Sequence, residues 1–152
     1  MALNTTGLAV ALQSMLGGLP TYTGAGNQMG DAIADFAATG EANGVPAVIS
    51  GGARSALKSA LGAQFAVVPG TAPGAATGIA AAITTMWLAA VFAGMASPPV
   101  VGPGTLQADL TAIFSTLGGD YASKASDIAN AITAHANIVI VTFPIIGSFL
   151  VV

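Results

Sequence analysis

The most constraining feature of this sequence is a long stretch without charge. Residues 59–108 contain no Asp, Glu, Lys or Arg. After Asp127 the only ionisable side chain is His135, and the chain then ends in IVIVTFPIIGSFLVV. Charged side chains are the ones that most strongly hold a segment at the water surface. A chain that lacks them over such lengths must cover its apolar surface with other protein chains or with lipid.

Composition narrows the classes of function. Hydrophobic residues make up 54% of the 152 residues and charged residues only 6%, whereas an ordinary soluble domain has about 25% charged residues. The length fits one domain. With only three basic residues in the chain, nucleic acid is excluded as a main partner, and the absence of Cys excludes disulfides and thiolate chemistry. No basic segment precedes the first apolar run, so we expect the N-terminus to belong to the mature protein.

Apolar residues recur at helical spacing in six segments separated by Gly and Pro. The sequence therefore predicts a mainly α fold, in which residues 1–136 form a compact bundle of about five to six amphipathic helices. Residues 137–143 are β-branched and favour a strand that Pro144 ends. We expect residues 137–152 to form an extended apolar C-terminal arm. The predicted helices begin near Asn4, Asn27, Ser50, Ala75, Leu106 and Ala122.

Two pairs of charged residues share one spacing. Asp31 and Asp35 lie four residues apart on the second predicted helix, and Arg54 and Lys58 lie four apart on the third. Residues at this spacing share one face of a helix. We predict that these two faces meet as inter-helix ion pairs, which fix how the helices dock and contribute roughly 0–1 kcal/mol each.

The segment Ala75–Ala96 is long enough to cross a bilayer. The mean hydropathy of the chain, +0.80, favours this alternative. Trp87 near the middle of the segment and the lack of flanking Lys or Arg argue against it. Gly74 and Gly78 have the spacing that lets helices approach closely in membranes. An integral membrane protein is therefore the second hypothesis, and a binding module with an apolar pocket for lipid or another small ligand is a weaker third.

Few residues are available for chemistry. No nucleophile elbow, zinc-binding HExxH or phosphate loop occurs, and we expect GAGNQMG at 24–30 to form a flexible loop. His135 is expected at a helix end, where the helix dipole favours it, and the Asp31–Asp35 pair on a solvated face. We predict no enzymatic activity, no metal, no cofactor and no small-molecule substrate. DAIADF at 31–36 and DIANAI at 127–132 are alike only as amphipathic helix, so no internal repeat is predicted.

Three stretches resemble the small Ala/Gly-rich structural proteins of tailed bacteriophages, namely SALKSALGAQF at 55–65, TTMWLAAVFAG at 84–94 and ASDIANAITAHANIVIVTFP at 125–144. The resemblance implies a tail, baseplate or capsid-associated subunit of the virion, assembled in the host cytoplasm. Its partners would be copies of itself or other virion proteins, and no functional residue is carried over. We expect the interface to use apolar residues of the fourth helix and the arm. These are Trp87, Phe92, Ile138, Ile140, Phe143, Pro144, Ile145, Ile146, Phe149 and Leu150.

Overall fold

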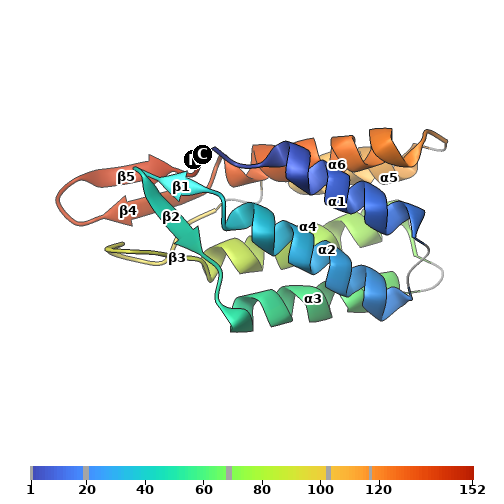
Figure 1. Ribbon diagram of the computed structural model, residues 1–152, viewed down its shortest axis with the longest axis horizontal. Coiled ribbons are helices and arrows are strands. Elements are labelled where there is room, and N and C mark those ends of the chain that lie inside the picture. Colours follow the sequence, from blue (N-terminus) through green and yellow to red (C-terminus); the bar gives the residue numbers. More distant parts are fainter. Residues whose placement is uncertain (1, 19–20, 68–69, 102–103, 117) are drawn as a thin grey trace.

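The computed structural model describes residues 2–18, 21–67, 70–101, 104–116 and 118–152. The described residues form a mainly helical protein, as predicted, with helices side by side in one half and short antiparallel strands in the other (Figure 1). The helices are α1 (Thr5–Gly17), α2 (Tyr22–Ala37), α3 (Gly51–Phe65), α4 (Ala72–Leu88), α5 (Leu106–Ser115) and α6 (Tyr121–Ala136). The strands are β1 (Glu41–Ala42), β2 (Val45–Val48), β3 (Val91–Phe92), β4 (Ile140–Phe143) and β5 (Gly147–Leu150).

The helix starts follow from capping side chains. Asn4 and Ser50 cap α1 and α3, as predicted, each accepting a hydrogen bond from a backbone N–H of the first turn. The second helix begins earlier than predicted, because the hydroxyl of Thr21 accepts from the N–H of Gly24 at 3.1 Å. The prediction of a flexible loop at 24–30 is wrong, since this segment lies inside α2.

Glycines inside α2 bring it close to α3. A Cβ atom added at Gly30 would lie 2.5 Å from Cγ and 3.0 Å from Cα of Lys58. At Gly26 it would lie 3.0 Å from the carbonyl oxygen of Lys58 and nearer still to the backbone of Gly62. Helical glycines cost stability unless they permit such an approach. Gly78 on α4 also lies close to α3, because a Cβ atom there would meet the side chain of Gln64.

The described residues also form three successive copies of one unit, which the sequence analysis did not predict. Each unit is a helical hairpin followed by extended chain, with α1–α2 in repeat 1, α3–α4 in repeat 2 and α5–α6 in repeat 3. The second helix of each repeat is capped at an equivalent position, by Thr21, Thr71 and Asp120. These caps lie 50 and 49 residues apart in the sequence.

Buried residues repeat with the same spacing. Leu12, Leu61 and Leu110 of the first helices are 49 residues apart and have no exposed surface. In the second helices, Ile33, Ile83 and Ile132 are equally buried and correspond in the same way. The similarity between DAIADF and DIANAI hid this relation, because the structural match to residues 127–132 is 28–33, three residues earlier than 31–36.

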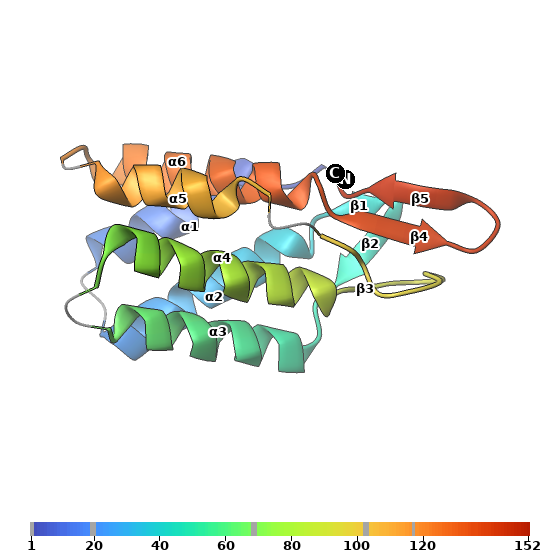
Figure 2. The same ribbon diagram turned by 180° about the vertical axis from the view of Figure 1, so that it is seen from behind.

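The three repeats close into a ring. In each repeat the two helices contact each other, α2 packs against α3, α4 against α5, and α6 returns to α1. Figure 2 shows α3, α4 and α5 from behind. The strands close in the same order. Strand β2 pairs with β3, Val100 pairs with Ile140, and Glu41 and Val152 exchange two backbone hydrogen bonds of 3.0 Å. The described chain therefore has approximate threefold symmetry, with its first and last described residues near one junction (Figure 1).

Two predictions about long apolar segments are corrected by this arrangement. Residues 137–152 are mostly extended and the strand that ends before Pro144 is present as β4, as predicted, but they do not project as an arm, because β4 and β5 form an antiparallel hairpin and Val139, Val141 and Val151 are buried. The segment Ala75–Ala96 is not one helix, since α4 ends at Leu88 and the chain continues into β3. Among the described residues, no helix has the length and apolar character that a membrane crossing requires.

Candidate functional site

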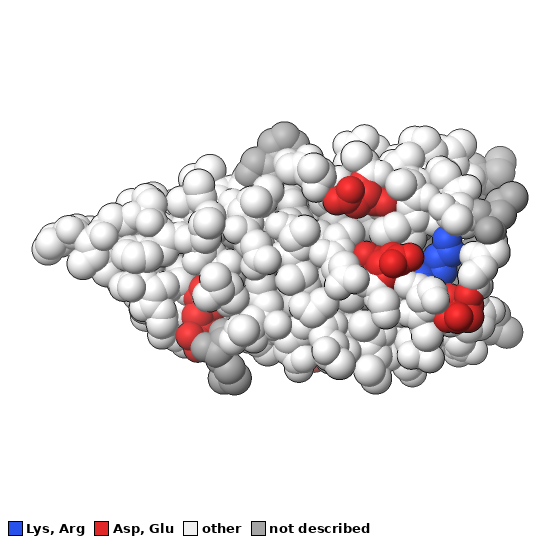
Figure 3. Space-filling model, turned by 90° about the horizontal axis from the view of Figure 1, so that it is seen from above, with Lys and Arg blue, Asp and Glu red and all other residues white. Residues whose placement is uncertain are grey.

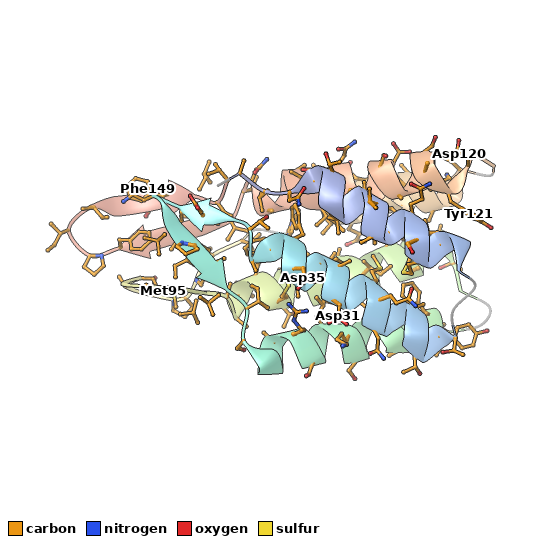
Figure 4. The ribbon with its side chains drawn as sticks, in the orientation of Figure 1. Asp31, Asp35, Met95, Asp120, Tyr121 and Phe149 are labelled. Atoms are coloured by element: carbon orange, nitrogen blue, oxygen red, sulfur yellow. The ribbon has the colours of Figure 1, made fainter. Side chains whose placement is uncertain are left out.

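The predicted ion-pair cluster is present between α2 and α3. Arg54 donates to Asp31 at 3.1 Å and also to Asp35, and Lys58 donates to Asp31 at 2.9 Å. Asp31 and Asp35 lie on α2 where it faces α3 (Figure 4). The hydrogen bond from Lys58 is the main reason that the pKa of Asp31 lies below its usual range. All four side chains remain partly exposed, so the cluster orients the helices and contributes little to stability.

His135 lies in the last turn of α6, as predicted, but it is buried, with 2% of its surface exposed. Its Nε2 lies 3.2 Å from the hydroxyl oxygen of Thr84 on α4, and its Nδ1 has no hydrogen-bond partner. Burial lowers the pKa of His135. Phe36 and Met86 occupy the equivalent positions in repeats 1 and 2 and are also buried. His135 therefore takes an apolar position of the repeat and is neutral at pH 7.

Each repeat carries a groove between its two helices. The groove of repeat 2 is the most apolar of the three, with a volume of about 430 Å³ and a lining that includes Ala60, Gly78 and Thr85. No charged residue lines it. The other two grooves have carboxylates at the equivalent positions. In repeat 1, Asp35 is equivalent to Thr85. In repeat 3, Asp109 and Asp127 are equivalent to Ala60 and Gly78. We call the repeat 2 groove the α3–α4 groove.

Exposed aliphatic side chains gather at the half of the molecule that holds the strands. We define the strand end as residues 41–49, 91–101 and 138–152. It contains nine of the fourteen large hydrophobic residues that are exposed in the described chain. Its only charged residue is Glu41. On the face of the molecule that Figure 3 shows, Lys and Arg atoms lie at the helical end, away from the strand end. The nine residues are Val48, Val91, Val100, Ile138, Ile140, Ile145, Ile146, Leu150 and Val152.

The exposed valines follow the repeat. Val48, Val100 and Val152 are 56%, 60% and 57% exposed, and each pairs with the first strand of the following repeat in the ring. The residues just before them, which include Ala47 and Val151, are buried. This alternation is the ordinary pattern of a strand with one covered face. The alternation of buried and exposed residues could have identified these surface valines from the sequence. The segments are too short for the alternation to stand out.

The predicted interface residues divide into two groups. Ile138, Ile140, Pro144, Ile145, Ile146 and Leu150 are exposed, and Phe149 is partly buried with its ring against that of Phe143 at 6.1 Å between centroids. Phe149 and Met95 both lie in the strand half (Figure 4). Trp87, Phe92 and Phe143 are at most 5% exposed. The prediction that these three form an interface is corrected, because their side chains fill the core of the described chain.

The tip of the β4–β5 hairpin has an unusual backbone. We define the hairpin tip as Pro144, Ile145 and Ile146. Ile145 has a φ of 74° and a fully exposed side chain, and the N–H of Ile146 donates to the carbonyl of Pro144 across it. A β-branched residue at positive φ in such a three-residue turn is strained. The corresponding turns of repeats 1 and 2 have Asn43–Gly44 and Gly94 at positive φ, which are the residue types that suit it.

Within the parts of the chain that the structure describes, no three His, Asp or Glu side chains are close enough to hold a metal ion. Comparison with known protein families, with curated proteins and with solved structures finds no match. The strand end is therefore the candidate functional site on the geometry of this chain alone.

Proposed function

We propose that this protein is a non-enzymatic structural subunit of a large assembly and that it docks through its strand end. The single observation that supports this proposal is the concentration of exposed aliphatic residues there, next to a helical half whose core is already covered. The exposed fractions of the nine residues correspond to about five whole aliphatic side chains. That is on the order of 700 Å², near the roughly 800 Å² that each partner contributes to a standard interface.

The chemistry of the strand end favours protein over lipid as its partner. Peripheral membrane surfaces commonly combine apolar side chains with Lys or Arg that attract anionic headgroups. The strand end has neither Lys nor Arg in its sequence. An apolar surface whose only charged residue is Glu41 is suited to the desolvated centre of a protein interface, where charged residues are depleted.

The setting that we propose is a bacteriophage virion, as a tail, baseplate or capsid-associated protein. The support for this setting is the resemblance of residues 55–65, 84–94 and 125–144 to small structural proteins of tailed phages. The partners would be copies of this chain or other virion structural proteins. No cofactor or small-molecule substrate belongs to this proposal.

The test is sedimentation of the protein with the particle from its native source. Wild-type chain should cosediment with a large particle in detergent-free buffer. A variant with Val48, Val100 and Ile140 changed to Thr keeps β-branched residues in the strands and should remain in the light fractions with an unchanged melting curve. A matched control with Val10 and Val67 changed to Thr should cosediment like the wild type. Recovery of the wild-type chain only as a free monomer would contradict the proposal.

Deletion of the whole C-terminal segment would not serve as the test. Val151 is fully buried, and the backbone of Val152 pairs with Glu41 to close the ring. Removing residues 144–152 would therefore unfold the chain as well as remove its surface. Substitutions at exposed positions separate these two effects.

A further inference from the structure

We propose that copies of this chain associate head to side, with the hairpin tip of one copy seated in the α3–α4 groove of the next. This inference rests on the proposed function, because it names the partner and the contact of that assembly. Both halves of the contact are on the described chain, and each differs from its equivalents in the other two repeats.

The hairpin tip is the first half of the contact. Ile145 is fully exposed at a φ of 74°, where the corresponding turns use Asn43, Gly44 and Gly94. Within one molecule the isoleucine side chain buries no surface, and its backbone is strained. Its stabilising contribution must therefore come from contact with another molecule. Pro144 and Ile146 extend the apolar surface on either side of it.

The α3–α4 groove is the second half. Its lining is mostly apolar, with Gln64 and Thr85 as the polar side chains and no charged residue, and about 430 Å³ is room for more than one aliphatic side chain. The equivalent grooves of repeats 1 and 3 have Asp35, and Asp109 with Asp127. Seating an isoleucine against those carboxylates would remove water from them, a cost that the ion pair of Asp35 with Arg54 offsets only in part. The tip is therefore expected to select the groove of repeat 2.

The position of the two elements makes the contact intermolecular. The β4–β5 hairpin projects from the strand end away from the helices (Figure 1), whereas α3 and α4 lie in the helical half (Figure 2). The tip cannot reach the groove of its own chain. A contact between two different patches is heterologous, so each copy offers one free tip and one free groove and the association continues from copy to copy.

The size of the contact determines how strong the association should be. Three side chains in one groove cover less than the roughly 800 Å² per partner of a standard interface. Each contact should therefore be weak alone, and association should increase with protein concentration. In an extended assembly every interior copy makes the contact twice.

Sedimentation velocity of the purified full chain over a hundredfold range of concentration, without detergent, tests the inference. The wild type should show a sedimentation coefficient that rises with concentration. Ile145→Asn should abolish this rise. Thr85→Asp should abolish it too, because it places a carboxylate in the α3–α4 groove at the position equivalent to Asp35 in repeat 1. Two matched controls should associate like the wild type. These are Val67→Asn, an exposed apolar residue outside the contact, and Ala134→Asp, the position equivalent to Thr85 in repeat 3.

A wild type that stays monomeric at every concentration would overturn the inference, as would association that survives both Ile145→Asn and Thr85→Asp. Melting curves of the same samples identify any variant that fails to fold, and for such a variant Ile145→Gly and Thr85→Glu give the same two readouts. Failure here is distinguishable from failure of the proposed function. A chain that is monomeric when pure but cosediments with a particle would assign the strand end to a different partner protein.

Discussion

Ile145→Asn should stabilise the monomer, although it removes a hydrophobic side chain. The side chain is fully exposed, so its loss costs no burial. An L-residue in the left-handed region costs roughly 1–2 kcal/mol, and Asn tolerates this region better than a β-branched residue does. Repeat 1 already places Asn43 at a φ of 52° in its turn. The expected gain is about 1 kcal/mol, which for a chain of this length raises the Tm by roughly 2–4 °C.

Calorimetry and urea unfolding at low protein concentration measure this gain without interference from association. Ile146→Asn serves as the comparison, because Ile146 is 55% exposed and does not have a positive φ. It should lower the Tm slightly. If Ile145→Asn left the Tm unchanged or lowered it, Ile145 would be supporting its own fold, and the argument that its side chain serves a partner would fail.

Three further predictions concern the helical half. Gly26→Ala should lower the free energy of unfolding by about 1–3 kcal/mol, because the new methyl meets the backbone of α3. Gly52→Ala, whose new methyl would lie 3.9 Å from Oγ of Ser50, an ordinary contact, should raise it by roughly 0.5 kcal/mol. Urea midpoints measure both changes. For His135, the lowered pKa means that the unfolded state binds the proton more readily, so wild-type stability should fall as pH drops below about 6.5. His135→Met should remove that dependence between pH 7 and 5, and an unchanged slope would refute the assignment. Arg54→Gln should lower the free energy of unfolding by less than about 1 kcal/mol, and this effect should disappear in high salt. A double-mutant cycle with Asp31→Asn measures the contribution of the ion pair.

The helical character of the chain and the docking of α2 on α3 could be predicted from sequence. Leucines at helical spacing and charged pairs four residues apart are local patterns, and the predicted ion pairs occur as expected. The start of α2 was missed because its glycines indicate a loop when read alone. They belong in a helix only because Lys58 and Gly62 of α3 lie against them, which is a tertiary cause.

The repeat and the strand end were harder to predict. The repeats share burial and capping positions and little residue identity, since Phe36, Met86 and His135 occupy one equivalent position. The exposed residues of the C-terminal segment were predicted as interface residues from their composition. The pairs that close the ring join short strands far apart in sequence, so they left no local pattern. Trp87 was expected at an interface but lies in the core. A large aromatic residue in an apolar segment is typical of both, so the sequence could not separate them.

The most direct test of the account is cysteine labelling of the assembled protein. The natural chain has no cysteine, so Ile146→Cys at the hairpin tip and Ser59→Cys on the exposed surface of α3 each provide a single reactive thiol. In the free chain both should react rapidly with a maleimide. In the assembled particle, Ile146→Cys should be protected while Ser59→Cys still reacts. Equal reactivity of the tip thiol in free and assembled protein would contradict docking through the strand end.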